Sequence, residues 1–467
     1  MIQKKYTFHT LDELKDIVYE ITEDDNYKTA SGVLLQMYNP KVDADEEAFV
    51  EYINAHCIRG ILIGITCANI ADEKYDIKDN PVELNVTYFQ KTKLIEMDFD
   101  MHDATGFVAG RIINEQLQFI PNAKCMQICY SCNSLVIHSF VNEFRHHNLP
   151  MFGAKAGRSI RVLNSDNVYG KRVNNNGIVV VIFQSESLGL YMDNCLGFKE
   201  IGLEMMVTKT EGDNVISMID NKPAIDIYSK YLKVRPNKFF VQNVCEFPLI
   251  FHRNDCIIAR IPSGYGEDGS IRLISDVAKG ETFRLSYGNE DNLSNVINKS
   301  IKGIQDFKPE ALFLFQCGNR ARFLKEKASN DTNPYIEICP EASVAIGYAE
   351  LFYTESGTGG ALNSALVAVG LTENGPQSNV IRPCLNYIDE TDELDDRDYI
   401  PFVERILYFL ETTSLELDAM NKELGKIAYT DQLTKIYNRW ELENKLEETL
   451  KTSEINNTPS CLIFMDI

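Results

Sequence analysis

The stretch GIVVVIFQSESLGLYMDN (residues 177–194) contains two β-rich runs on either side of the polar segment QSES. Turn residues between two such runs are typical of a β-hairpin. LEMMVTKTEGDNVISMI (residues 203–219) repeats the pattern around its own Gly-Asp-Asn turn. We therefore expect two hairpins here. They open a β-rich region with further strands at KFFVQNV, PLIFHR, CIIARIP, SIRLISDV and TFRLSY, residues 238–287.

The sequence before this region alternates between the two kinds of periodicity. Helical spacing and buried apolar runs follow one another, as expected for a layered α/β domain. The helices are expected near 12–21, 45–56, 103–118 and 133–147, and the strands near 31–38, 58–68, 85–97 and 123–131. After the β-rich region we expect a helix at 292–307 and strands at 311–317, 343–353 and 364–373.

Composition excludes several classes of protein. The chain has 467 residues, 44% of them hydrophobic, so it can bury about three domain cores. A formal net charge of −22 argues against binding to nucleic acid or to an anionic membrane. No apolar run approaches the roughly 20 residues of a membrane span, and the first residues have no apolar core of a signal peptide. The 12 scattered cysteines suggest reduced thiols and a cytoplasmic location.

Two segments that could suggest metal sites have simpler interpretations. In CMQICYSC, Cys125 and Cys129 would share one face of a strand while Cys132 points the other way, so buried free thiols are favoured. The acidic run DETDELDD lacks the glycine of a calcium-binding loop. We interpret residues 372–397 as an acidic linker.

Residues 398–430 carry a heptad pattern. Apolar residues recur every seven positions in two series offset by three, which is the a/d seam of a coiled coil. Such a seam would join this chain to a second copy as a homodimer. An amphipathic helix lying on its own domain is the alternative. The seam residues are Val403, Ile406, Leu410, Leu417, Met420, Leu424 and Ile427, with Thr413 at the remaining position.

The end of the chain starts a new unit. Asp431 and Thr434 are expected to end the long helix, and Asn438 can cap the next one through its side chain. That helix is followed by CLIFMDI (residues 461–467), which has the composition of a buried strand with Asp466 at its carboxyl end. Open α/β sheets usually bind ligands and metals at that end.

Asp431, Leu433, Thr434, Asn438 and Arg439 resemble the opening of a GGDEF domain, the diguanylate cyclase family, over residues 431–467. The resemblance implies that the acid ending the first strand and the next carbonyl, here Asp466 and Ile467, bind Mg²⁺ on GTP. Lys435 and Trp440 depart from the family pattern, and the Gly-Gly-Asp/Glu-Glu-Phe signature is absent from this sequence. We therefore expect a truncated GGDEF domain that makes no cyclic di-GMP by itself.

Most of the chain resembles the FIST sensory domain (residues 28–222) and its FIST_C partner (residues 223–371). The resemblance rests on IRGILIGITCANI, MFGAKAG, the ordered series over 177–232, ALFLFQCGNRARFL and AIGYAELFY. It implies an intracellular sensor of small molecules, with amino acids as the suggested ligands. No cofactor is implied for this region.

Five residues are candidate ligand-binding residues. Cys317, Asn319 and Arg320 follow a buried strand, and Gly347 and Glu350 lie in another. An arginine and a glutamate that converge at strand ends could hold the carboxylate and amine of a zwitterion. The alternative, which the residue types alone favour slightly, is that the two pair with each other or cap nearby backbone.

These expectations combine into a sensor-transducer. A FIST module would bind a small molecule, the heptad helix would dimerise, and a GGDEF domain in the complete protein would condense two GTP into cyclic di-GMP. Two alternatives stay open: a non-enzymatic ligand-binding or adaptor protein, and a degenerate GGDEF domain that binds nucleotide without turnover.

Overall fold

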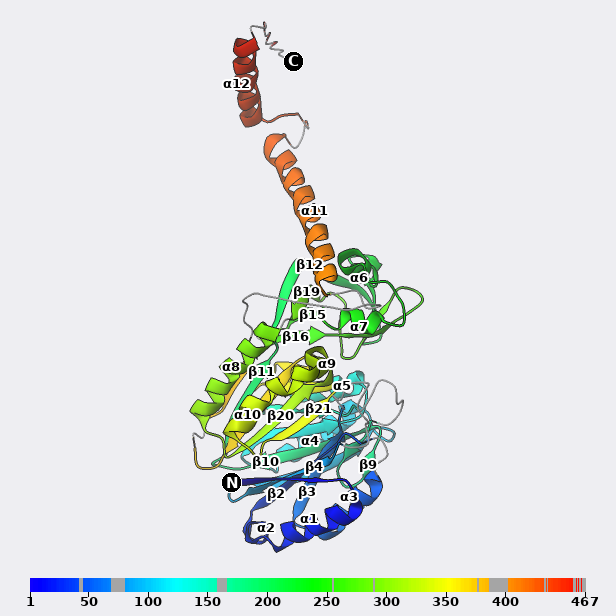
Figure 1. Cartoon of the computed structure of the whole chain (residues 1–467), viewed down its shortest axis with the longest axis vertical. Coiled ribbons are helices and arrows are strands. Elements are labelled where there is room, and N and C mark those ends of the chain that lie inside the picture. The colour runs from blue at the N-terminus through cyan, green and yellow to red at the C-terminus, as the bar shows by residue number, and fades with distance from the viewer. Residues whose placement is uncertain are drawn as a thin grey trace.

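The computed structural model has a mixed α/β fold. It describes residues 1–41, 45–68, 80–157, 166–253, 256–288, 290–375, 378–385, 402–431, 434, 436–456, 459, 461 and 463. Three sheets form a body, a further group of strands forms an insert, and two helices extend away from both (Figure 1).

The first sheet has the order β1-β4-β2-β3-β8-β9. Three amino-terminal helices pack on its outer face, because their apolar residues recur at helical spacing and meet the sheet in one core. The strands are β1 (Ile2–Phe8), β2 (Gly32–Asn39), β3 (Gly60–Thr66), β4 (Val82–Phe89), β8 (Val168–Tyr169) and β9 (Val173–Asn174). The helices are α1 (Leu11–Glu23), α2 (Asp25–Thr29) and α3 (Glu46–His56).

The second sheet, of order β23-β22-β7-β6-β10-β5, packs one face against the first. Its other face is covered by α4 (Gly106–Leu117) and α5 (Ser134–Asn142). Asn133 caps α5, since its side chain accepts a hydrogen bond from the Val136 amide. The strands are β5 (Lys93–Asp100), β6 (Ala123–Tyr130), β7 (Met151–Lys155), β10 (Gly177–Gln184), β22 (Ala349–Tyr353) and β23 (Gly359–Leu362).

The third sheet has the order β21-β20-β24-β11-β25. The long helix α8 (Glu290–Phe307) covers one face together with α10 (Asn333–Ile338). After β20 the chain forms α9 (Gly318–Leu324) and a short 3₁₀ helix at Lys325–Asp331. The strands are β11 (Gly189–Cys195), β20 (Ala311–Cys317), β21 (Ser343–Gly347), β24 (Leu366–Thr372) and β25 (Val380–Leu385).

The chain between β11 and α8 forms the insert, residues 198–288, whose strands pair only with one another. It carries α6 (Asp226–Leu232) and α7 (Phe240–Val244). The strands are β12 (Phe198–Glu211), β13 (Val215–Ile219), β14 (Lys222–Pro223), β15 (Leu249–Arg253), β16 (Cys256–Arg260), β17 (Pro262–Tyr265), β18 (Ile271–Leu273) and β19 (Thr282–Gly288). In Figure 1 the insert lies between the body and the carboxyl-terminal helices.

Several strand predictions need correction because the chain passes from one sheet to another. Residues 177–194 are not a hairpin: β10 lies in the second sheet and β11 in the third. The run 85–97 divides into β4 and β5, and 343–353 divides into β21 and β22, again in separate sheets. The prediction of a hairpin at 203–219 is confirmed by the antiparallel pair β12–β13.

Two further predictions differ from the structure. The segment 238–244 was expected as a strand but contains α7, whose Phe240 and Val244 are buried in the core of the insert. Within the expected linker 372–397, residues 380–385 form β25, which pairs in parallel with β11. Residues 386–401 lie outside the described part of the chain.

The helix expected at 398–430 is α11 (Phe402–Tyr429), and α12 (Arg439–Asn456) follows it. Both extend away from the body and the insert (Figure 1). Asn438 accepts a hydrogen bond from the Glu441 amide at 3.0 Å, so it caps α12 as expected.

Candidate ligand-binding site

The five candidate residues meet where strands of the second and third sheets end. Cys317 ends β20 and Gly347 ends β21, and the two are register partners in a parallel pair. A Cβ added at the neighbouring Gly318 would lie 3.2 Å from the Gly347 carbonyl oxygen, so the chains approach closely here. Glu350 reaches the same place from β22.

Cys317 and Glu350 form a fully buried pair. Both side chains are 0% exposed. Burial raises the pKa of the Glu350 carboxyl well above its usual range, and burial and Glu350 together raise the pKa of the Cys317 thiol. Glu350 Oε2 accepts a hydrogen bond from the Ala365 amide at 3.4 Å, whereas Oε1 has no partner among the described residues.

Arg320 is committed to the protein itself. Its Nε lies 2.5 Å from an Asp331 carboxylate oxygen, and its Nη1 donates to the Cys195 and Leu196 carbonyls at 3.1 and 2.7 Å. Burial opposes the charge of Arg320, but Asp331 more than offsets this and raises the pKa of the guanidinium. Arg320 thus caps nearby backbone, but its ion-pair partner is Asp331 and not Glu350.

Asn319 connects the body to the insert. Its Nδ2 donates to the Ser364 hydroxyl at 3.0 Å and to the Cys245 carbonyl, in the insert, at 3.2 Å. Ser364 is buried with φ of 57°, a left-handed conformation that costs energy for a residue other than glycine. Sequence reasoning missed Ser364, the neighbouring Asn363 and Asp331. Their only signal is that they are polar residues beside buried segments.

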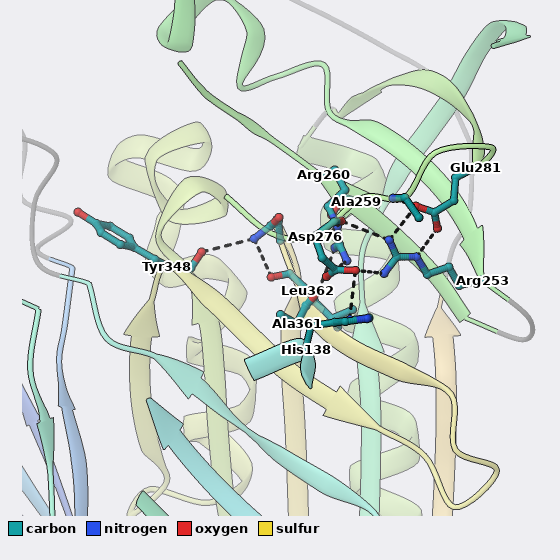
Figure 2. Close-up of polar contacts among 11 residues, drawn as sticks. His138, Arg253, Ala259, Arg260, Asp276, Glu281, Tyr348, Ala361 and Leu362 are labelled. Carbon is teal, nitrogen blue, oxygen red and sulfur yellow. Dashed lines mark hydrogen bonds and ion pairs between the residues drawn. The ribbon is translucent and has the colours of Figure 1, made fainter. Parts of the chain in front are cut away.

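A second polar network joins the insert to the body (Figure 2). Arg260, which is 1% exposed, donates to the Ala361 carbonyl of the body at 3.0 Å and pairs with Asp276 at 3.0 Å. Arg253 bridges Asp276 and Glu281 at 2.5 and 2.6 Å. Asp276 is also 3.5 Å from the His138 ring of α5, so the carboxylate connects three elements.

The base of α11 is held by the insert. Arg405 is fully buried; it donates to the Asn243 carbonyl, pairs with Glu246 and lies 5.1 Å from the Phe247 ring. Phe409 packs over Gly202, whose φ of 75° and missing Cβ leave room for the ring.

About two turns further along α11, Glu416 pairs with Lys230 of α6. The four described leucine and methionine side chains of the heptad pattern from Leu410 onwards are exposed. Leu410, Leu417, Met420 and Leu424 are 45–61% exposed, whereas Val403 and Ile406 are partly buried. The side chain of Ile427 lies outside the described part. The coiled coil itself stays a prediction.

At the GGDEF-like start, Asp431 accepts hydrogen bonds from the Thr434 amide and hydroxyl, both at 2.8 Å. This turn follows the end of α11 directly. Arg439 forms an exposed ion pair with Glu443 on α12. The proposed metal ligands Asp466 and Ile467, and Leu433, lie outside the described residues.

The thiol prediction is confirmed where the structure describes it. Cys125, Cys129 and Cys132 are free and buried. Within the described ranges no cluster of three or more His, Cys, Asp or Glu side chains could hold a metal ion. Among the described helices, none combines the length and the apolar character needed to cross a membrane.

Comparison with family models gives two matches. The FIST N domain matches residues 34–222 and the FIST C domain matches residues 224–349, so together they cover about two thirds of the chain. They give no support to the GGDEF interpretation of residues 431–467. A search among curated proteins returned no match. The two domains indicate a signal-transduction sensor. The two matches follow one another over residues 34–349, so the chain belongs to the FIST family of proteins.

Proposed function

We propose that this chain senses a small molecule in the cytoplasm and transmits the signal through α11 to a second copy of itself and to an output domain. One observation carries the proposal. The insert accepts a hydrogen bond from Asn319 of the candidate site and another from Arg405 at the base of α11. The free thiols fit the reducing cytoplasm.

The contacts give a continuous route from site to helix. Asn319 bonds to the carbonyl of Cys245, and the residues on both sides of Cys245 hold Arg405. A ligand that shifts Asn319 would therefore displace the segment 243–247 and with it the base of α11. Allosteric coupling requires this contact to differ between the ligand-free and the ligand-bound protein, and a ligand that moves Asn319 would produce that difference.

The ligand class follows from the resemblance to FIST sensors, which suggests amino acids. Glu350 Oε1 and Asn363 Oδ1 are buried atoms without a hydrogen-bond partner among the described residues. Both could accept from the ammonium group of an amino acid. Arg320 cannot supply the matching cation without releasing Asp331.

For the output we propose a GGDEF domain that begins at Asp431 and, in the complete protein, makes cyclic di-GMP. The motif residues from Asp431 to Arg439 and the turn and cap that they form support it. Asp466 and the Ile467 carbonyl would hold Mg²⁺, which would polarise the GTP phosphates. Sequencing the coding region past Ile467 tests this: an intact signature supports a cyclase, and a stop codon leaves an adaptor.

The sensor proposal is tested by screening the twenty amino acids and other small metabolites for thermal stabilisation of the purified chain. A hit should also change hydrogen exchange in residues 243–247 and 402–416. A ligand that stabilises the body but leaves exchange in α11 unchanged would contradict the route. No stabilising ligand in a broad panel would contradict the sensor itself.

A further inference from the structure

Two polar side chains lie next to each other beneath α5, where β6 and β7 end. Tyr130 and Lys155 are register partners in this parallel pair, and Tyr130 belongs to the core between the second sheet and its helices. Tyr130 is 1% exposed, and its hydroxyl has no hydrogen-bond partner among the described residues. Lys155 is partly buried, and its ammonium has no ion pair or hydrogen bond within the same residues.

Both groups are held away from water at a cost to the folded state. Burial lowers the pKa of the Lys155 ammonium and raises that of the Tyr130 hydroxyl well above its usual value. Native proteins rarely leave buried donors unpaired. Proteins break this rule mainly at functional sites, so two neighbouring unpaired donors at the end of a sheet indicate a binding site.

The chain that leads into α5 passes close to this pair. Cys132 interacts electrostatically with both Tyr130 and Lys155, and α5 begins two residues after it at Ser134. The amide N–H groups of a first helical turn and the positive end of the helix dipole attract anions.

Two acids near Tyr130 do not cancel this field. Burial raises the pKa of the Glu350 carboxyl well above its usual range, which favours its uncharged form. Asp276 is ionised, but Arg260 and Arg253 neutralise it at 3.0 and 2.5 Å. Asp166 also interacts electrostatically with Lys155, but the two form no ion pair among the described residues, so the Lys155 ammonium keeps its hydrogen-bond donors for a ligand.

We propose that Lys155 and Tyr130, at the amino-terminal end of α5, bind the carboxylate of the small ligand that this protein detects. A carboxylate accepts hydrogen bonds from an ammonium and a hydroxyl together, and both donors are free for it. The proposal rests on the proposed sensor function. Lys155 would bind the ligand carboxylate in place of Arg320, which is already bonded to Asp331 and to backbone carbonyls.

The test uses sodium acetate as the probe, with sodium chloride at equal ionic strength as the reference. Acetate should raise the Tm of the wild-type chain above the chloride value, and the concentration dependence gives an apparent Kd. Lys155→Met and Tyr130→Phe should each raise this Kd by about tenfold or more. Lys124→Met is the matched control, since Lys124 is also partly buried but lies at the other end of β6.

A second readout separates binding from a merely structural role. Without acetate, both variants should melt at or above the wild-type temperature, because they remove donors that have no partner. Tyr130→Phe removes a single hydroxyl and keeps the test usable if Lys155→Met folds poorly. An acetate response that survives in both variants, or is missing from the wild type, would overturn the proposal.

The metabolite screen distinguishes failure of the proposed carboxylate site from failure of the proposed sensor function. A metabolite whose thermal shift survives Lys155→Met would overturn the carboxylate site but keep the sensor. A metabolite whose shift is lost in Lys155→Met and kept in Lys124→Met would support both.

Discussion

At the scale of single residues, Arg320 is held by contacts on every side of its guanidinium. Replacing it with alanine would leave Asp331, which is 3% exposed, as a buried charge without its partner. Arg320→Ala should therefore lower the free energy of unfolding by about 3–5 kcal/mol. Urea unfolding measures the change. Arg322→Ala, two residues away and exposed, is the control and should stay within about 0.5 kcal/mol of wild type.

Asp276 gives the chain an acid-sensitive contact. Burial opposes its charge, but Arg260 and Arg253 outweigh burial and lower the pKa of the carboxyl to about 2. The stabilisation from this shift is present above the ordinary pKa of 3.8 and is lost as the pH falls towards 2. The difference in unfolding free energy between wild type and Asp276→Asn should shrink by about 2 kcal/mol between pH 5 and pH 2. A constant difference would contradict the assignment.

The candidate site could be predicted in part from single residues. The apolar run before Cys317 indicated correctly that this residue lies near a strand end, because apolar runs and their polar ends are local signals. Glu350 was placed within one long strand, whereas it lies near the start of the separate strand β22. The partner of Arg320 could not be found in this way. Asp331 is eleven residues away in a short 3₁₀ helix, and only the folded chain brings the two together.

At the scale of elements, helices were predictable and strand partners were not. The helices α1, α3, α5 and α8 lie where periodicity places them, since an amphipathic stripe specifies its own buried face. Strands β10 and β11 are buried on both faces in separate sheets, so each has a nearly continuous apolar sequence. Such a sequence carries no information about which sheet a strand joins, and the four residues between them fit a hairpin or a crossover.

The exposed stripe of α11 leads to a prediction about assembly. Leu410, Leu417 and Leu424 are more than half exposed and recur every seven residues. The purified chain should therefore be a dimer in sedimentation equilibrium. Leu417→Glu should weaken the dimer by about tenfold or more, because it places like charges on both helices in the seam. Ala419→Glu, exposed and at position c away from the seam, is the control. A wild-type chain that stays monomeric would contradict the coiled coil.

At the scale of the whole molecule, the sequence domains and the physical units do not coincide. The two family matches meet near residue 223, inside the insert, while β22 and β23 of the second half complete a sheet of the first. The insert joins the body at Gly197, where φ is 75° and a Cβ would lie 2.8 Å from a methyl of Leu293. The boundary between the family matches therefore does not separate the body from the insert, and the insert contacts α11 at Arg405, Phe409 and Glu416.

This arrangement makes Arg405 the point where binding and transmission can be separated. Arg405→Met keeps an apolar stem against Phe247 but removes the bonds to Asn243 and Glu246. A ligand found by thermal shift should stabilise this variant as much as wild type, because the body is unchanged. Its effect on hydrogen exchange in residues 402–416 should fall by at least half.

Arg439→Met, in the exposed first turn of α12, is the matched control for Arg405→Met and should keep the full exchange response. If the response survives in Arg405→Met, the signal leaves the body by some route other than the insert. If the thermal shift is lost as well, Arg405 contributes to binding itself. If the insert passes a ligand-induced displacement to the base of α11, Arg405→Met should keep the ligand-induced thermal shift and show a reduced hydrogen-exchange response.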